Sequence, residues 1–186
     1  MTGAGHGWWR RNALALVAVV VLAGATAWTQ TAQERSARDD YTPTRPVHAA
    51  PGETLEFAGA TYTVVDVERL YPGGLPRGTA ALRVTVDVAA AADGALPEMC
   101  TIRIEESAGS HGRREWLDAA YSPVDFLEVE GTRTSCSSGE DDDGRGAFRL
   151  AVPFVVPSDV DGTLTLRVET TEAIPHYAAL ELGPLP

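Results

Sequence analysis

The sequence predicts an all-β domain, built as a sandwich or barrel, behind one N-terminal membrane helix. Three observations predict it. An uncharged apolar stretch lies close to the N-terminus, several later runs alternate apolar and polar residues, and turns rich in Gly, Pro and Asp separate these runs. Alternation with a period of two is the pattern of a strand with one buried face, and many short strands with turns between them are typical of β-sandwiches and barrels.

The first element is a predicted transmembrane helix over residues 12–33, which two arginines precede. A helix from Trp9 to Trp28 would be about 28 Å long at the usual rise per residue, which matches a hydrocarbon core of ~30 Å. Tryptophan prefers the headgroup level at both ends of such a helix. Because the arginines favour a cytoplasmic segment 1–11, we expect a single-pass cell-membrane protein with its N-terminus inside and its C-terminal domain outside.

A cleaved signal peptide is the alternative interpretation of the same stretch. Ala25-Thr26-Ala27 resembles the small-residue site of signal peptidase. Cleavage near Ala27 would release a secreted chain. Both interpretations place residues 41–186 outside the cytoplasm.

A stalk is predicted over residues 34–52, between the membrane helix and the domain. Its first part carries mixed charge, and Pro43, Pro46 and Pro51 follow among few apolar residues. Proline-rich segments of this kind are extended and semi-rigid. The β-domain is then predicted over residues 53–186, a length that can bury a core of its own.

The domain contains about eight runs with strand periodicity. In the run 81–89, for example, Leu82 and Val84 share one face while Arg83 and Thr85 share the other. Such a run buries one face and exposes the other. The strands are expected at residues 54–57, 60–70, 81–89, 100–105, 114–119, 148–156, 164–168 and 177–182.

The charge balance excludes two classes of partner. The chain of 186 residues has a net charge of −11, and all 15 of its cations are arginine. A strongly acidic domain is a poor match for nucleic acid, whose phosphates need cationic partners, and for an anionic lipid surface. We therefore expect no nucleic-acid partner. A composition rich in Ala, Gly and Arg without lysine is typical of a GC-rich bacterium, such as an actinobacterium.

Two cysteines predict one disulfide. Cys100 shares a strand face with Ile102 and Ile104, so it is expected to point inward. In an exported domain a pair of cysteines usually forms a disulfide, so we predict a bond between Cys100 and Cys136. The pair has neither the CxxC spacing of a redox motif nor the cysteine-histidine spacing of a zinc site.

Four stretches carry a resemblance to a known family. PGETLEFAGATYTVVDVERL is followed by the alternating strand TAALRVTVDVAA, then by CTIRIEESAGSHGRREW, and finally by CSSGEDDDGRGAFRLAVPFVVP, a turn and a strand with Val-Pro-Phe. In this order they resemble the telokin-like domains of unknown function on exported Gram-positive proteins, which are similar to the immunoprotective extracellular protein of mycobacteria. The resemblance covers residues 50–185. It implies an immunoglobulin-like β-sandwich of about seven to nine strands outside the cell, and no catalytic residue.

Two acidic turns are candidates for calcium binding. Asp141 and Asp143 precede one glycine, and Asp159 and Asp161 precede another, as in part of an EF-hand loop. Neither turn has the ligands that an EF-hand needs at its first and twelfth positions. Crowded like charges beside glycine are also typical of solvated turns. We expect no metal or cofactor, and a weak calcium site made of these four aspartates is the alternative.

No pattern of residues predicts catalysis. Ser110 and His111 lie in GSHG, which is not the G-x-S-x-G elbow, and none of the four histidines has the spacing of a metal pair. Trp116 and Tyr121 could form a binding patch, although Trp116 is interpreted as a core residue. We therefore expect a non-enzymatic, membrane-anchored β-sandwich that binds another envelope or membrane protein or serves as an accessory module. The alternative is an extracellular ligand or calcium sensor that uses the acidic turns.

Overall fold

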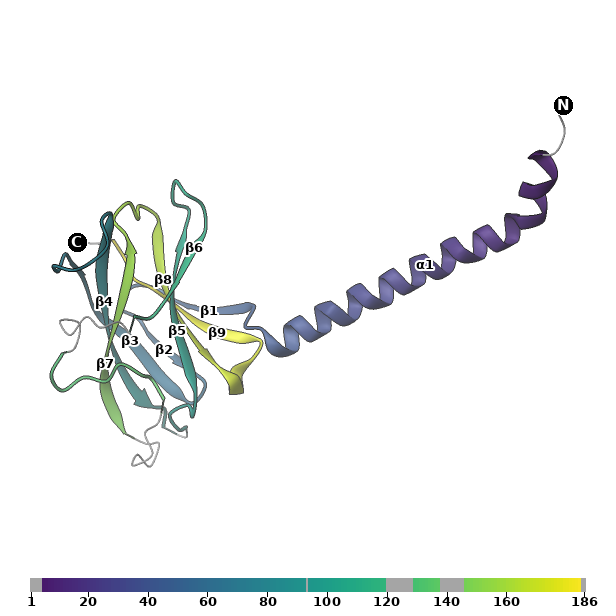
Figure 1. The fold of residues 1–186 in the computed structure, drawn as a ribbon. Helices are drawn as coiled ribbons and strands as arrows, with labels where there is room; N and C mark the ends of the chain where they lie inside the picture. Colours follow the sequence, from purple (N-terminus) through teal and green to yellow (C-terminus); the bar gives the residue numbers. More distant parts are fainter. Residues whose placement is uncertain (1–4, 93, 120–128, 138–145, 185–186) are drawn as a thin grey trace. The chain divides into compact units, whose positions relative to one another are not determined.

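The computed structural model describes all residues except 1–4, 93, 120–128, 138–145 and 185–186 (Figure 1). The chain divides into two compact units, Met1–Thr42 and Pro43–Pro186. The first unit holds the N-terminal helix and the second holds the β-domain.

The first unit is the helix α1, Gly5–Tyr41. Its segment Asn12–Ala37 is long and apolar enough to cross a membrane, with a mean hydropathy of 1.8. The predicted span 12–33 lies inside this segment. The helix also continues through the first part of the predicted stalk, because residues 34–41 lack glycine and proline and contain the good helix formers Ala, Glu and Arg.

The second unit is a sandwich of two β-sheets. Its described residues form nine strands, in a five-stranded sheet with the order β1-β9-β8-β5-β6 and a four-stranded sheet with the order β2-β3-β4-β7. A short 3-10 turn, Thr171–Ala173, precedes the last strand. The strands are β1 Arg45–Ala49, β2 Thr54–Phe57, β3 Ala60–Leu70, β4 Thr79–Ala90, β5 Cys100–Ser107, β6 Arg114–Leu117, β7 Ala147–Pro157, β8 Thr163–Thr170 and β9 His176–Glu181.

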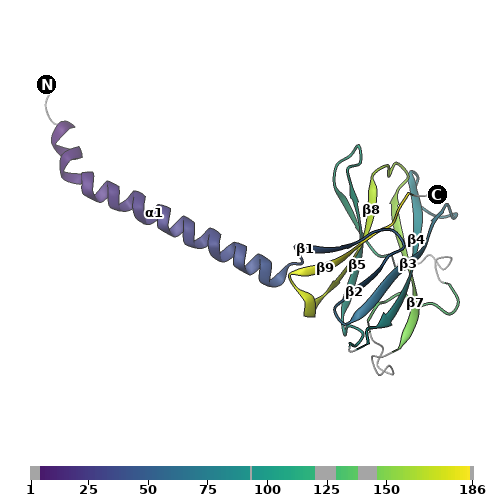
Figure 2. The ribbon, with the colours of Figure 1, turned by 180° about the vertical axis from the view of Figure 1, so that it is seen from behind.

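The order of the strands is that of an immunoglobulin-like sandwich. The chain crosses from one sheet to the other between β1 and β2, between β4 and β5, between β6 and β7, and between β7 and β8. As a result β4 pairs with β7 in one sheet while β5, β8 and β9 lie side by side in the other. This connectivity is that of the central strands of immunoglobulin domains. Figure 2 shows the sandwich from behind, with β1 beside β9.

Alternating residues of the strands fill the space between the sheets. In β4 and β7 the inward residues lie opposite one another, as in the pairs Val84↔Val152 and Val86↔Leu150, and all four side chains are fully buried. Burial of such side chains contributes about 1.5–3 kcal/mol each. The inward faces predicted for these strands are therefore confirmed. The opposite sheet contributes Ile102, Ile104, Leu164, Leu166, Val168 and Leu180.

The structure corrects the predicted stalk and domain boundary. Residues 45–49, predicted as part of the stalk 34–52, form β1, which pairs in parallel with β9 through contacts such as Val47↔Ala178. The β-unit therefore begins at Pro43 rather than at residue 53. The sequence conceals this strand because it is short, contains Pro46 and has few apolar residues, all of which an edge strand tolerates.

The predicted disulfide is present in the structure. Cys100 at the start of β5 bonds to Cys136, and their Cα atoms are 6.0 Å apart. Cys136 is fully buried and belongs to the core. The bond therefore ties the segment that precedes β7 to the opposite sheet.

Candidate binding groove

The outer face of the four-stranded sheet carries small and charged residues in regular rows. The register places Thr63 beside Asp87 and Asp87 beside Arg149, one row across β3, β4 and β7. The next row contains Thr85 and Ala151. Because residues paired directly across strands share a face, the small side chains in the middle of these rows leave a hollow floor.

A β-bulge in β3 determines which side chains join this floor. The register between β3 and β4 shifts between Val64 and Asp66. A bulge adds one residue and changes the face to which later side chains point. Asp66 and Glu68 therefore lie on the outer face, opposite Thr85 and Arg83 respectively.

The segment 129–133 forms one wall of the hollow. The backbone amide of Arg133 donates to the carbonyl of Arg149 at 2.9 Å, and the amide of Ala151 donates to the carbonyl of Arg133 at 2.8 Å. The Thr132 hydroxyl donates to the carbonyl of Val129 at 2.7 Å. These bonds fix the wall to the outer edge of β7 and occupy part of that edge.

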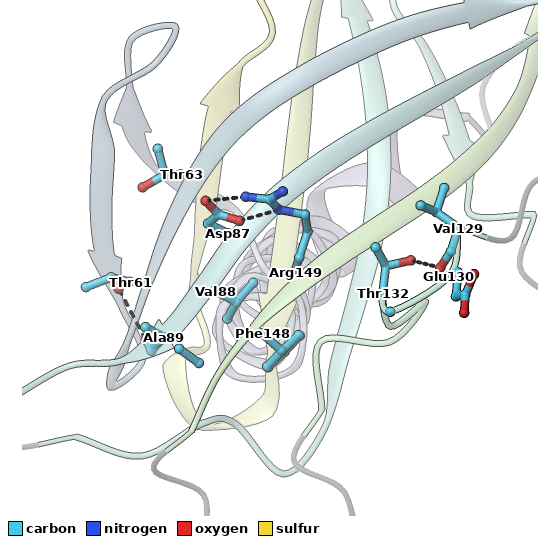
Figure 3. Close-up of a pocket in the computed structure, with 12 residues that line it drawn as sticks. Thr61, Thr63, Asp87, Val88, Ala89, Val129, Glu130, Thr132, Phe148 and Arg149 are labelled. Atoms are coloured by element: carbon cyan, nitrogen blue, oxygen red, sulfur yellow. Dashed lines mark hydrogen bonds and ion pairs between the residues drawn. The ribbon is translucent and has the colours of Figure 1, made fainter.

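Two adjoining hollows make one groove along the strands, which we call the sheet groove. The larger has a volume of about 590 Å³ and the smaller about 350 Å³. Both are lined by Val129, Thr132 and Arg149, so they adjoin at these residues. Figure 3 shows the wall residues facing the side chains of β3, β4 and β7 across the larger hollow. The remaining residues that line the larger hollow are Thr61, Thr63, Asp87, Val88, Ala89, Glu130, Gly131, Ala147 and Phe148.

Two ion pairs cross the floor of the sheet groove. Arg149 donates to both carboxylate oxygens of Asp87, from Nε at 2.8 Å and from Nη2 at 3.3 Å. This pairing raises the pKa of Arg149. Arg83 donates to Glu68, from Nε at 2.9 Å. The side chains that line the two hollows include four acids, Asp66, Glu68, Asp87 and Glu130, and two arginines. A third arginine, Arg133 of the wall, lies 4.4 Å from the centre of the Phe148 ring, so acids outnumber arginines by one.

The outer face of the other sheet is occupied by its own side chains. Arg167 is largely buried there, donates to Glu105 at 3.2 Å and pairs with Glu169 at 2.7 Å. Its guanidinium also lies 4.1 Å from the centre of the Tyr177 ring. Arg103 donates to Glu115 at 2.8 Å. These contacts fill the middle of this face, and a hollow of about 520 Å³ remains beside β6, lined by Arg103, Glu115, Trp116, Leu117, Ala119 and Val155.

The structure gives two of the four candidate calcium ligands other partners. Asp159 pairs with His111 at 3.0 Å and with Arg114 at 3.2 Å. Asp161 accepts a hydrogen bond from the backbone amide of Ser110 at 3.0 Å. In the described part of the chain no three His, Cys, Asp or Glu side chains are grouped so as to hold a metal ion. The other two candidates, Asp141 and Asp143, lie outside the described residues.

A buried carboxylate organises the turns around these aspartates. The side chain of Glu106 has no exposed surface. It accepts hydrogen bonds from Arg114 Nε at 2.6 Å and from the backbone amides of Asp161 and Gly162 at 3.0 and 2.8 Å. The hydrogen bond from Arg114 is the main cause of a lowered pKa at Glu106, against the opposing effect of burial. This arrangement stabilises the fold, because one carboxylate accepts hydrogen bonds from three donors on different parts of the chain.

The remaining sequence candidates do not assemble into a catalytic site in the described residues. Ser110 and His111 lie between β5 and β6 and engage different aspartates. Trp116 packs against the core, as interpreted from the sequence, and Arg114 lies 5.4 Å from the centre of its ring. Tyr121 lies outside the described residues. Sequence reasoning missed the sheet groove, although the polar face of residues 81–89 was one signal for it.

Comparisons with known proteins relate the chain to solved structures only. No protein-family model matches the sequence, and no curated protein matches it significantly. The resemblance to telokin-like exported domains therefore stays a prediction. A candidate lipoprotein from Staphylococcus aureus is similar in structure, with a TM-score of 0.49 and 11% identity over 74% of this chain and 93% of the other.

A second similar structure is an uncharacterized β-sandwich protein from Clostridium difficile. It has a TM-score of 0.42 and 12% identity, over 75% of this chain and 97% of the other. A candidate lipoprotein from Bacillus subtilis has a TM-score of 0.40 and 13% identity, over 69% of this chain and 37% of the other. At this level of similarity no function is transferred to the chain.

Proposed function

We propose that this chain is a membrane-tethered, extracytoplasmic β-sandwich that binds another envelope protein through the sheet groove. The single observation that carries the proposal is the open groove on the four-stranded sheet, bounded by the fixed segment 129–133. Exposed hollows with a few placed polar groups are typical of binding sites. On the opposite sheet, ion pairs cover the middle of the face, and the hollow beside β6, of about 520 Å³, has no adjoining second hollow among the described pockets, so it supports binding less well.

Two features support the location outside the cytoplasm. The helix segment Asn12–Ala37 is long and apolar enough to span a membrane, and disulfides such as Cys100–Cys136 are stable in oxidising compartments. We propose a single-pass anchor with its N-terminus inside. Mass spectrometry of the mature N-terminus tests the anchor, because cleavage near Ala27 would leave a chain that starts at Trp28.

The edges of the sandwich favour binding through side chains rather than through an added strand. The edge strand β1 contains Pro46, and the edge strand β7 contains Pro153 and is partly covered by Arg133. The other two edge strands, β2 and β6, have only four residues each, and short edges offer little backbone for pairing. Proline and covering segments blunt a strand edge against pairing with another chain. The partner is therefore expected to contact the face of β3, β4 and β7.

Site-specific photo-crosslinking of the full chain in its native membrane tests the proposed function. A photoreactive residue replaces Thr85 on the groove floor, and the control replaces Thr101, which lies on the outer face of the other sheet. We expect a discrete crosslinked partner from position 85 and none from position 101. Equal crosslinking from both positions, or none from either, would overturn the proposal.

A calcium-sensing function has less support in the structure. Asp159 and Asp161 are already held by His111, Arg114 and Ser110. A calcium ion at these aspartates would have to displace those partners. Melting of the protein in millimolar calcium and in chelator separates the two functions, since a calcium-dependent rise in Tm would favour the sensor.

A further inference from the structure

We infer that the sheet groove takes an extended, positively charged polypeptide segment of the partner. The inference rests on the proposed function and adds the chemistry of the ligand. The sign of the ligand's charge follows from the acids of the groove, and its extended shape follows from the direction in which the two hollows lie.

The sign follows from acids that the groove leaves without a cation. Arg149 and Arg83 neutralise Asp87 and Glu68. Asp66 and Glu130 are exposed and form no ion pair within the part of the chain that the structure describes.

These two acids lie on opposite sides of the groove. Asp66 is on β3 and Glu130 is in the wall beyond β7, with β4 and β7 between them. A hollow lined by an excess of one charge attracts ligands of the opposite charge. The ligand is therefore cationic.

The shape follows from the register of the strands. The larger hollow lies over the row of Thr63, Asp87 and Arg149, and the smaller lies over the rows of Asp66 and Glu68 further along the same strands. The groove thus follows the strand direction. Asp66 and Glu68 are two residues apart, a rise of roughly 6.7 Å in a strand, which is also the spacing of alternate residues in an extended peptide. Basic residues at every second position of such a peptide can therefore lie over successive rows of the strands, so that one of them faces Asp66, the unpaired acid of the smaller hollow.

The polar floor disfavours the two simpler occupants. An apolar segment would remove the Asp87–Arg149 pair from water without replacing its hydration, which is costly. An anionic ligand would meet the unpaired carboxylates of Asp66 and Glu130. A basic segment gains from both acids and leaves the two existing ion pairs intact.

Fluorescence anisotropy with designed peptides tests the inference on the full chain in a non-ionic detergent. The probe is a fluorescein-labelled (Arg-Ser)4 octapeptide, and its counterpart is (Glu-Ser)4. We expect only the basic peptide to bind, and its affinity to fall several-fold between about 50 mM and about 300 mM salt, because exposed charges are screened. Binding of both peptides, or of neither, overturns the inference.

A pair of matched variants locates the binding. The double variant D66N/E130Q removes the two unpaired acids and is expected to weaken binding about fivefold or more. The control E98Q/E181Q removes two exposed acids elsewhere with the same change of net charge, and its affinity should stay within about twofold of wild type. Equal weakening in both variants would mean non-specific attraction and would overturn the inference. If position 85 captures a partner but the basic peptide does not bind, the inference fails while the proposed function stands.

Discussion

The carboxylate of Glu106 accepts a 2.6 Å hydrogen bond from Arg114 Nε in the buried end of the sandwich. The pair joins β5 to β6, and the other oxygen of Glu106 binds the amides of Asp161 and Gly162 in the turn before β8. One side chain thus connects three elements. The sequence gives Glu106 inward parity with Ile102 and Ile104, a position that a charged residue occupies only when it is fully paired.

Replacement of Glu106 by Gln should destabilise the β-unit by about 2–4 kcal/mol. The amide cannot neutralise Arg114, and its NH2 group cannot accept hydrogen bonds from the donors that face it. Urea unfolding of residues 43–186, which form a compact unit, measures the change. The control is Glu98→Gln at an exposed position. If Glu106→Gln loses no more stability than Glu98→Gln, Glu106 does not hold the three elements together.

The stability of the β-unit should fall in acid because of Glu106. Its pKa is lowered below the usual 4.5, mainly by the hydrogen bond from Arg114. A group with a lowered pKa in the folded state stabilises above its unfolded pKa, and this contribution is lost as the pH falls through the folded pKa. Asp161, whose pKa is lowered mainly by hydrogen bonds from Ser110, acts in the same direction.

Urea midpoints measured from about pH 6 to about pH 3 test this pH dependence. The midpoint of the wild-type unit should decrease over this range, and the decrease should be smaller in Glu106→Gln. If the urea midpoint decreases with pH equally in the two proteins, carboxylates other than Glu106 cause the loss of stability in acid.

The strands of the sandwich could be predicted because apolar and polar residues alternate along them. The sheet groove could not be predicted in this way. The face of Leu82, Val84 and Val86 is a local pattern, and the predicted range 60–70 agrees with β3. The placement of β4 beside β7 is not local, so the sequence alone did not show which polar faces adjoin. The bulge between Val64 and Asp66 depends on the partner strand for the same reason.

Two further features escaped prediction because they depend on backbone pairing. The wall 129–133 is held by the backbone amide and carbonyl groups of Arg133, which every residue except proline possesses. Strand β1 is recruited by β9 in a parallel edge pairing that requires little side-chain burial. In contrast, the Cys100–Cys136 bond could be predicted because the compartment and the number of cysteines left few alternatives.

Loss of the Cys100–Cys136 disulfide should cost about 3–4 kcal/mol, because the bond closes a loop with a sequence separation of 36 residues. The variant Cys100→Ala/Cys136→Ala should therefore melt well below the wild type. Addition of a reducing agent should lower the Tm of the wild type and leave the Tm of the variant unchanged. A reductant effect of the same size on both proteins would argue against this stabilisation.

Replacement of Tyr62 by Phe should leave the β-unit as stable or slightly more stable near neutral pH. The Tyr62 hydroxyl is buried and has no hydrogen-bond partner in the described residues, so its removal ends an uncompensated desolvation cost. Burial raises its pKa to about 12, and a raised tyrosine pKa destabilises the folded state as the pH rises above the unfolded value. The free energy of unfolding should thus fall less steeply between about pH 9 and about pH 12 in Tyr62→Phe than in the wild type. A marked loss of stability in Tyr62→Phe at neutral pH would contradict this prediction, because it would mean that the hydroxyl has a partner.

Replacement of Gly162 by Ala should destabilise the turn that Glu106 holds. A Cβ atom at this position would lie 2.5 Å from the carbonyl oxygen of Ser107 and 2.7 Å from the amide nitrogen of Gly109. Both are backbone atoms, so the turn or the hairpin has to move, and overpacking of this kind typically costs about 1–3 kcal/mol. The matched control is Gly73→Ala, where no heavy atom lies within 4 Å of the added Cβ, and its stability should change by less than about 1 kcal/mol. Urea unfolding measures the stability of both variants. An equal loss of stability in the two would mean that the close approach of the two turns does not restrict which residue fits at position 162.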